Sequence, residues 1–306
     1  MMLKQLLGGV MLATLMVPGP ASAQDYPDGP VTVVVPFSAG GSNDTIGRYM
    51  AERLGSLWGV PFVVENRAGG GTAVGAAHVA NAAPDGQTIL FVSGSYSINA
   101  ATRTDMPFDP IADLLPVAMV ATADIGVVSG PRLPIATLDD LVREAQKGEV
   151  FYATAGAGSQ QHFYGALLAD VLGIEMTAVP YPGGAEGLLD LLGGRVDIVV
   201  GTVSGMLTTI ENGATPVAIL SEERSASLPD TPTVAELGFN EAVTHTYWAV
   251  FVPAETPPEV MEKLHEGITE AMNDEEAAAF LASLDAAPSA MSIDEVQAAI
   301  KSEIAT

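Results

Sequence analysis

The stretch VTVVVPFSAGGSNDTIGR, residues 31–48, joins an apolar run, a glycine turn and the start of an amphipathic segment. The run Val31–Val35 is rich in β-branched residues and is bounded by prolines, which is typical of a strand covered on both faces of a parallel sheet. Gly40 and Gly41 carry no Cβ, so the backbone can turn tightly there and a ligand can approach it closely. The stretch therefore predicts a strand that turns directly into a helix.

The residues after this turn predict an amphipathic helix that ends near Gly59. Its apolar residues recur every three or four positions and would form one buried face: Ile46, Met50, Leu54 and Leu57. Ser42 is a residue type that caps helix N-termini. The free N–H groups of the first helical turn would lie above the glycines, where a carboxylate or a phosphate binds favourably. We therefore expect an anion site at this turn.

Composition excludes several classes of protein. The chain has no cysteine, which excludes disulfides, iron–sulfur clusters, thiolate zinc sites and a lipoprotein anchor. Its 37 acidic and 12 basic residues give a net charge of −25, so nucleic acid and anionic membrane surfaces are unfavourable partners. The 306 residues, 48% of them hydrophobic, are enough for one large or two ordinary domains. A bound anion would have to be held by local N–H dipoles.

Residues 1–23 have the features of a secretory signal peptide. They contain one lysine, an apolar run from Leu6 to Val17, and small residues that end at Ala23. The apolar run is shorter than the roughly 20 residues that span a bilayer, and no later stretch qualifies. We therefore expect cleavage after Ala23 and an exported, soluble mature protein.

The opening pattern recurs in the second half of the chain. Val150–Thr154 predicts a strand, Ala155–Gly158 a glycine turn, and Ser159 the cap of a helix that ends before Gly173. The expected buried face of this helix is Phe163, Leu167 and Val171. Two units of strand, glycine turn and helix predict two half-sites that face each other across a cleft.

Strand and helix patterns alternate along the rest of the chain, which indicates an α/β fold with a mainly parallel sheet. Further strands are expected at residues 60–65, 88–92, 109–120 leading into 125–128, 173–180, 195–201, 216–220 and 246–253. Further helices are expected at residues 72–82, 137–147, 185–192, 203–211, 258–272, 275–284 and 294–304. The segment Pro229–Gly238 would suit a connection between lobes.

Some local patterns allow more than one interpretation. The glycines at 69–75 weakly resemble a dinucleotide fingerprint, because Val74 replaces its third glycine, and a close-approach turn at a cleft is favoured instead. Ser159 and His162 lie one helical turn apart, but no orienting acid is evident, so we favour a helix cap over a nucleophile. Arg67 could clamp an anion, although an ion pair is favoured. No nucleophile elbow, P-loop or zinc-ligand spacing is present, so we expect no catalytic residue, metal or cofactor.

A series of motifs stands in the order found in one family: VPFSAGG, VENRAGGGT, PDGQT, TAGAGSQQH, VPYPGGAEGLLDLLGGRVD, PDTPTVAELG and WAVFVPAETP. Over essentially its whole mature length the chain resembles the periplasmic substrate-binding proteins of tripartite tricarboxylate transporters, the Bug-type receptors. This resemblance implies a type II periplasmic-binding-protein-like fold, with two α/β lobes around a ligand cleft. It implies residues 24–123 with 246–306 as lobe one and residues 124–245 as lobe two. We expect a periplasmic monomer that binds a small organic carboxylate and docks on a membrane permease.

In such receptors the two glycine turns hold the ligand carboxylate, one from each lobe. Carried over to this sequence, the resemblance implies backbone contacts at Phe37, Ser38, Ala39, Gly40, Gly41, Gly156, Ala157, Gly158 and Ser159. Asp44, Gln160 and His162 would line or brace these turns. The remaining wall would contain Ser93, Gly94, Ser95, Tyr181, Gly183, Gly184 and Thr202. Pro182 stands where the family commonly has a basic residue, so the resemblance leaves the far end of the ligand undetermined.

The prediction is therefore an extracytoplasmic solute receptor that delivers a carboxylate to a permease. The alternative is a secreted α/β enzyme that acts on a carboxylated or nucleotide substrate. A receptor would bind its ligand and release it unchanged, whereas an enzyme would convert its substrate to a product.

Overall fold

The computed structural model describes residues 26–156, 158–181, 183–284 and 286–305. The expected signal peptide, its cleavage site, Ala157 and Pro182 lie outside these ranges. Within them, none of the helices combines the length and the apolar character that crossing a membrane requires.

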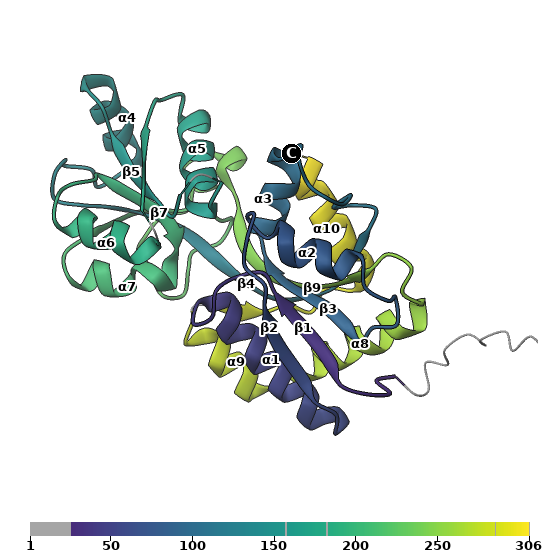
Figure 1. Cartoon of the computed structure of the whole chain (residues 1–306). Helices are drawn as coiled ribbons and strands as arrows, with labels where there is room; N and C mark the ends of the chain where they lie inside the picture. The colour runs from purple at the N-terminus through teal and green to yellow at the C-terminus, as the bar shows by residue number, and fades with distance from the viewer. Residues whose placement is uncertain (1–25, 157, 182, 285, 306) are drawn as a thin grey trace, which may run out of the picture.

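Two α/β lobes share one long strand (Figure 1). This strand, β4 (Leu114–Ser129), pairs with β9 (His245–Pro253) in lobe one and, from Ile125 onward, with β7 (Ile198–Thr202) in lobe two. The sheet order is β2-β1-β3-β9-β4-β7-β5-β6, with β8 and β10 both paired to β4. The expectation of two separate elements at 109–120 and 125–128 is therefore wrong, because almost every residue between Leu114 and Ser129 is buried in a single continuous strand.

Lobe one places helices on both faces of a mixed sheet. Its other strands are β1 (Val31–Val35), β2 (Phe62–Asn66), β3 (Thr88–Ser93) and β10 (Ala286–Pro288). Its helices are α1 (Ser42–Trp58), α2 (Ala73–Ala80), α3 (Ser95–Thr102), α8 (Pro258–Met272), α9 (Glu275–Ala282) and α10 (Ile293–Ala305). Val33 packs with α1 and α8 on one face, whereas Val34 packs with α2, α3 and α10 on the other. This alternation explains why all four valines of the strand are buried.

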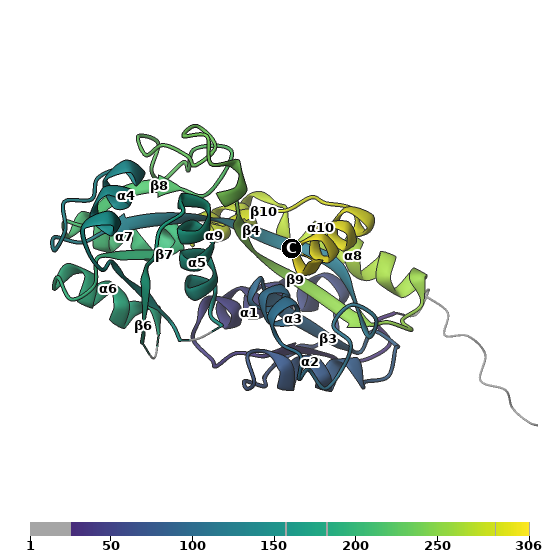
Figure 2. The ribbon, with the colours of Figure 1, turned by 90° about the horizontal axis from the view of Figure 1, so that it is seen from above.

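Lobe two repeats this layered arrangement. Its strands are β5 (Phe151–Thr154), β6 (Thr177–Pro180), β7 and β8 (Thr215–Ile219). Its helices are α4 (Leu138–Lys147), α5 (Gln160–Leu172), α6 (Gly184–Leu192), α7 (Val203–Glu211) and the 3₁₀ turn η2 (Asn240–Ala242). One core packs α4 and α5 against the sheet, and a second packs α6 and α7 against its other face. Helix α5 lies beside α3 of lobe one, so the two lobes are in contact (Figure 2).

The chain passes between the lobes within β4 and again at the start of β9. Ala123 pairs with Thr246 in lobe one, Asp124 pairs with His245 at the boundary, and Ile125 pairs with Thr202 in lobe two. We therefore propose the lobe limits that the resemblance implied, with residues 124–245 as lobe two.

Several local expectations were wrong. Leu57 and Phe163 are each 38% exposed, and the buried face of α5 is formed by Tyr164, Gly165 and Leu168. The N-cap of α1 is Gly41, not Ser42, and no side chain caps this helix. The error in α5 is a rotation by one position, because a helix with apolar residues on most sides leaves its inward face ambiguous.

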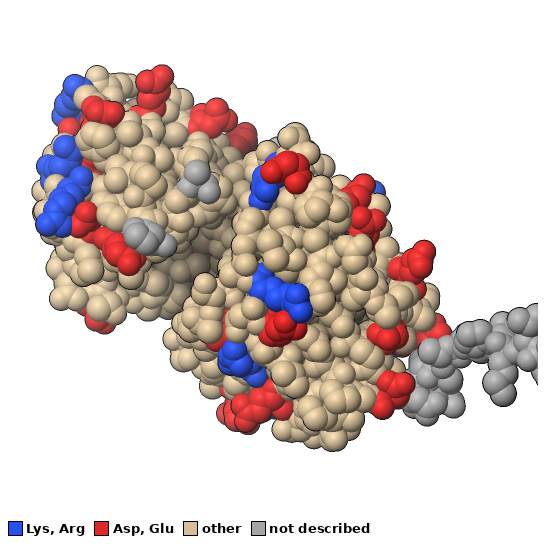
Figure 3. Space-filling model, viewed as in Figure 1, with Lys and Arg blue, Asp and Glu red and all other residues tan. Residues whose placement is uncertain are grey.

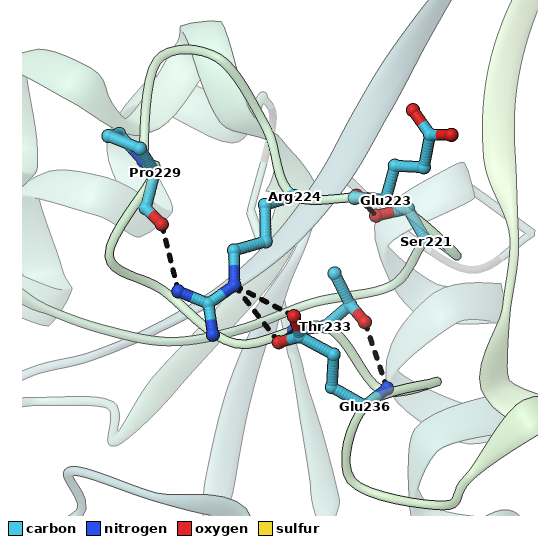
Figure 4. Close-up of polar contacts among 6 residues, drawn as sticks. All are labelled: Ser221, Glu223, Arg224, Pro229, Thr233 and Glu236. Atoms are coloured by element: carbon cyan, nitrogen blue, oxygen red, sulfur yellow. Dashed lines mark hydrogen bonds and ion pairs between the residues drawn. The ribbon is translucent and has the colours of Figure 1, made fainter.

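The segment Pro229–Gly238 does not connect the lobes. It folds back on lobe two, where Thr233 forms a bridge with Ile219 at the end of β8. Arg224 donates from Nε to both carboxylate oxygens of Glu236 at 2.9 and 3.0 Å and from Nη1 to the Pro229 carbonyl at 2.9 Å (Figure 4). These contacts make the segment part of the outer wall of lobe two.

Candidate functional site

A cavity of about 340 Å³ lies between the two lobes. Lobe one lines it with Phe37, Gly71, Thr72, Ser95 and Asn99, and lobe two with Ala155, Gly158, Ser159, Gln160 and Gln161. None of these described lining residues carries a charge. In Figure 3 the surface between the lobes is hollowed and mostly uncharged in this view. The cavity follows the carboxyl ends of β1, β3 and β5, where ligands commonly bind in α/β sheets.

A buried carboxylate holds the glycine turn of lobe one in place. The Oδ2 of Asp44 accepts hydrogen bonds from the Gly40 amide at 2.9 Å and from Arg48 Nε at 3.0 Å. Asn66 Nδ2 donates to Asp44 Oδ1 at 2.9 Å and to the Phe37 carbonyl at 3.1 Å. The hydrogen bond from Arg48, with those from Gly40 and Asn66, lowers the pKa of Asp44 to about 2. Asp44 therefore braces the turn, as one of the two roles expected for it.

The hydrogen bond to Asp44 occupies the Gly40 amide, which is one of the amides that the resemblance assigned to the ligand. Gly40 donates to Asp44, whereas the amides of Ser38, Ala39 and Gly41 find no acceptor among the described residues. Those three residues are exposed, and Phe37 is the part of the turn that lines the cavity. In this structure Gly40 is therefore a structural residue of the turn.

The glycine turn of lobe two is held by its own helix. The Gly158 amide donates to His162 Nδ1 at 3.2 Å, and the His162 amide donates to Ser159 Oγ at 3.2 Å. Ser159 is thus the N-cap of α5, as predicted. The Ser159 amide donates to the Gly156 carbonyl at 3.2 Å. The His162 ring accepts from the Gly158 amide and not from the Ser159 hydroxyl, so the geometry does not form a nucleophile and base.

The next two residues, Gln160 and Gln161, also line the cavity. Among the described residues, no acceptor is found for the backbone amides of Gln160 and Gln161, which open the first turn of α5. The Gln160 side chain points away from the ligand space: its Nε2 donates to Thr246 Oγ1 at 2.6 Å and to the Tyr164 hydroxyl at 3.2 Å. Because Thr246 belongs to β9, this side chain links the two lobes.

A second cavity, of about 290 Å³, adjoins the first inside lobe two. Both cavities are lined by Gln161. The second also contains Thr202 and Gly184, at the N-termini of α7 and α6, and apolar side chains including Leu188 and Met206. No lining residue of this cavity that the structure describes is charged. Gln161 therefore lies between the two cavities.

Several residues expected at the site lie outside both linings. The Tyr181 hydroxyl donates to Asp190 Oδ2 at 2.9 Å, and burial together with this bond raises the pKa of Tyr181. Gly94 is buried beside the Gln160 side chain, and Gly183 is the N-cap of α6. Ser93 and Gly156 also line neither cavity, and Ser93 is 2% exposed with no partner for its Oγ. These residues support the walls from behind.

Apart from the predicted glycine turn at 155–158, sequence reasoning missed four residues that line the cavity between the lobes. These are Gly71, Thr72, Asn99 and Gln161. The triple glycine at 69–71 was the one available signal for them, through its interpretation as a close-approach turn at a cleft. Arg67 forms the favoured ion pair, with Glu65 at 2.8 Å. No cluster of three or more metal-ligating side chains occurs in the part of the chain that the structure describes.

Comparison with known proteins places this geometry in a family. Residues 46–306 match the model of the tripartite tricarboxylate transporter family receptor. Protein BugT of Bordetella pertussis is 35% identical over 301 residues, covering 97% of this chain and 92% of that protein. An R. palustris protein solved with adipate is 31% identical, with a TM-score of 0.80 and coverage of 92% of this chain and 95% of that one.

MatC from Rhodopseudomonas palustris, solved with bound malate, is 26% identical with a TM-score of 0.79, covering 92% of this chain and 98% of that one. These neighbours confirm the two-lobed α/β fold. Because the family model covers most of the chain and BugT is similar over nearly its whole length, this chain belongs to the periplasmic receptors of the tripartite tricarboxylate transporter family.

Proposed function

We propose that this protein is an extracytoplasmic solute receptor that binds a small organic carboxylate between its two lobes. The observation that supports this most directly is the uncharged cavity between the lobes, which free helix N-terminal amides border. The family is one of substrate-binding receptors, and two structural neighbours were solved with the carboxylates adipate and malate. The enzyme alternative has less support, because the Ser159 and His162 side chains do not pair.

Backbone donors are strong enough for this task. Micromolar binding needs about −8 kcal/mol. Each charge-assisted hydrogen bond contributes about 1.5–3 kcal/mol, and a partly buried helix N-terminus adds up to about 2 kcal/mol. Among the described residues, no acceptor is found for the amides of Gln160 and Gln161 in lobe two or of Ser38, Ala39 and Gly41 in lobe one, which are enough donors. In this proposal the carboxylate is held mainly by N–H groups from both lobes.

The loaded receptor then delivers its ligand to a membrane permease of the tripartite tricarboxylate type. Family membership supports this partner, because the family is defined as the receptor of such transporters. It also supports a periplasmic location, in agreement with the secretory features of residues 1–23. We propose that the receptor acts as a monomer.

Calorimetry against a panel of mono- and dicarboxylic acids tests the proposed function. Stoichiometric binding with every acid recovered unchanged by mass spectrometry supports a receptor, and formation of a product supports the enzyme alternative.

The variant that tests the glycine turn of lobe one is Gly41→Val. Gly41 has a φ of −85° and no atom within 4 Å of the position that a Cβ would take. The substitution is therefore tolerated by the fold and places a branched side chain at the free amide. We expect at least a tenfold loss of affinity with unchanged thermal stability. Unchanged affinity would remove this turn from the binding site.

A further inference from the structure

Thr72 combines two unfavourable features at the edge of the cavity. Its φ of 84° makes it the one non-glycine residue with positive φ among those that the structure describes. Its side chain is buried, with the residue 2% exposed, and its Oγ1 has no hydrogen-bond partner. A left-handed conformation is strained for a β-branched residue, and an unpaired buried hydroxyl loses its hydrogen bonds to water, so both features destabilise the fold. Such costs persist mainly at sites where another molecule makes use of them.

The position of Thr72 in the wall of the cavity indicates that this molecule is the ligand. Thr72 lines the cavity between the lobes and is the N-cap of α2, yet its side chain does not cap this helix. The preceding residues, 69–71, are glycines with positive φ, so the loop is bent to bring Thr72 into the wall. Thr72 thus brings a buried hydroxyl without a hydrogen-bond partner to the wall of the cavity.

Asn99 of α3 places a free acceptor at the same wall. Its Nδ2 donates to the Ser95 carbonyl at 2.7 Å, which orients the amide and leaves Oδ1 as the free end. A Cβ at Gly71 would lie 2.5 Å from this oxygen, and one at Gly158 would lie 3.9 Å from it. Asn99 Oδ1 therefore lies between the Gly71 loop of lobe one and the glycine turn of lobe two.

We propose that Thr72 and Asn99 form a subsite for a hydroxyl group of the ligand, so that the preferred substrates are hydroxycarboxylates. A ligand hydroxyl donates its proton to Asn99 Oδ1 and accepts one from Thr72 Oγ1, which satisfies both groups. This inference rests on the proposed function, because the carboxylate grip is what brings the ligand to this wall.

The other common substituents fit this subsite less well. A second carboxylate would place its oxygens against the carbonyl oxygen of Asn99, and two acceptors repel. An ammonium group could donate to Asn99, but the N-terminus of α2 carries partial positive charge and no described lining residue is acidic. A neutral group that both donates and accepts is the best match.

Isothermal titration calorimetry with matched acids tests this inference. The pairs are malate with succinate and lactate with propionate, which differ by one hydroxyl group. We expect the wild-type protein to bind the hydroxy acid of at least one pair about tenfold or more tightly. Thr72→Val keeps the β-branched shape and removes only the hydroxyl, so it should abolish this preference with little effect on the affinity for the deoxy acid. Thr72→Ser should retain the preference.

A remote control comes from Thr256, whose Oγ1 is also buried and unpartnered in a residue that is 4% exposed. It lies in the turn before α8 and lines neither cavity, so Thr256→Val should leave both affinities unchanged. If acids bind but the paired affinities are equal, or if Thr72→Val preserves the preference, the hydroxyl subsite is wrong and the receptor proposal stands. Tighter binding of aspartate than of malate would also overturn the hydroxyl subsite. If no acid binds the wild-type protein, the proposed function itself fails.

Discussion

Replacement of Asp44 by asparagine tests whether one buried carboxylate holds the glycine turn of lobe one. The pKa of Asp44 falls from 3.8 to about 2, chiefly through its hydrogen bond with Arg48. Each pKa unit corresponds to about 1.4 kcal/mol, so this shift corresponds to roughly 2 kcal/mol of folding free energy. The Asp44 side chain is 7% exposed, so water screens it little, whereas Arg48 is half exposed and stays solvated when the pair is broken. We expect Asp44→Asn to lower the free energy of unfolding by about 2 kcal/mol at pH 7.

The pH dependence of this difference identifies its cause. A carboxylate with a lowered folded-state pKa contributes fully above its unfolded-state pKa and loses that contribution as pH falls through its folded-state pKa. The gap between wild type and Asp44→Asn should therefore be constant from pH 7 to about pH 5 and should close between about pH 4 and pH 2. Urea unfolding followed by circular dichroism at each pH measures it.

A surface pair provides the control for this experiment. Asp105 pairs with Arg103 at 2.9 Å, but its side chain is 74% exposed, so Asp105→Asn should change stability far less. Equal stability of wild type and Asp44→Asn at pH 7 would refute the proposed brace. A gap that persists unchanged at pH 2 would show that the loss comes from packing and not from the charge.

Three other predictions concern the walls of the site. Burial raises the pKa of Glu303 to about 7, so its contribution to stability is full below pH 4.5 and is lost as pH rises through 7. The melting temperature of the wild type should therefore fall between pH 5 and 8, and Glu303→Gln should remove this fall. Gly71→Ala places a Cβ 2.5 Å from Asn99 Oδ1 at a φ of +59°, so urea unfolding should show a loss of about 1 kcal/mol or more. Gln160→Leu removes the 2.6 Å hydrogen bond to Thr246, so small-angle scattering should show a larger radius of gyration, and an unchanged radius would contradict this link between the lobes.

Much of the fold could be predicted because its signals are local. The bounds of α7 (Val203–Glu211) and α8 (Pro258–Met272) were predicted to the residue, since glycine, proline and apolar spacing mark both ends. Helix α3 (Ser95–Thr102) was missed because its short sequence has few apolar residues at helical spacing. Strand β4 was divided because polar Thr122 and Asp124 interrupt an otherwise apolar run. Only pairing with β9, far along the chain, makes it one strand.

The site was predictable in outline, because its glycine turns are local features, and not in detail, because its side-chain contacts join distant residues. The two glycine turns are local features, and the cavity between the lobes contains residues from both. The sequence does not show which of their amides have partners: the Gly40 and Gly158 amides are both occupied, because the Asp44 and His162 side chains fold back onto them. Likewise, Asn99 reaches Gly71 only because α3 packs beside the loop before α2. Side-chain contacts between separate elements produce no periodic pattern in the sequence, so they could not be predicted from it.

The distribution of charge explains how an acidic receptor can bind an anion. The protein carries a net charge of −25, yet the charged groups at the glycine turn of lobe one, Asp44 and Arg48, neutralise each other and hold that turn. The described lining residues of both cavities are uncharged, so the attraction for a carboxylate comes from fixed N–H dipoles that act over a few ångströms. Such dipoles treat all small carboxylates alike. Discrimination between acids must therefore come from neutral polar atoms and from the shape of the walls, which gives Thr72, Asn99 and Gln161 the largest influence on specificity.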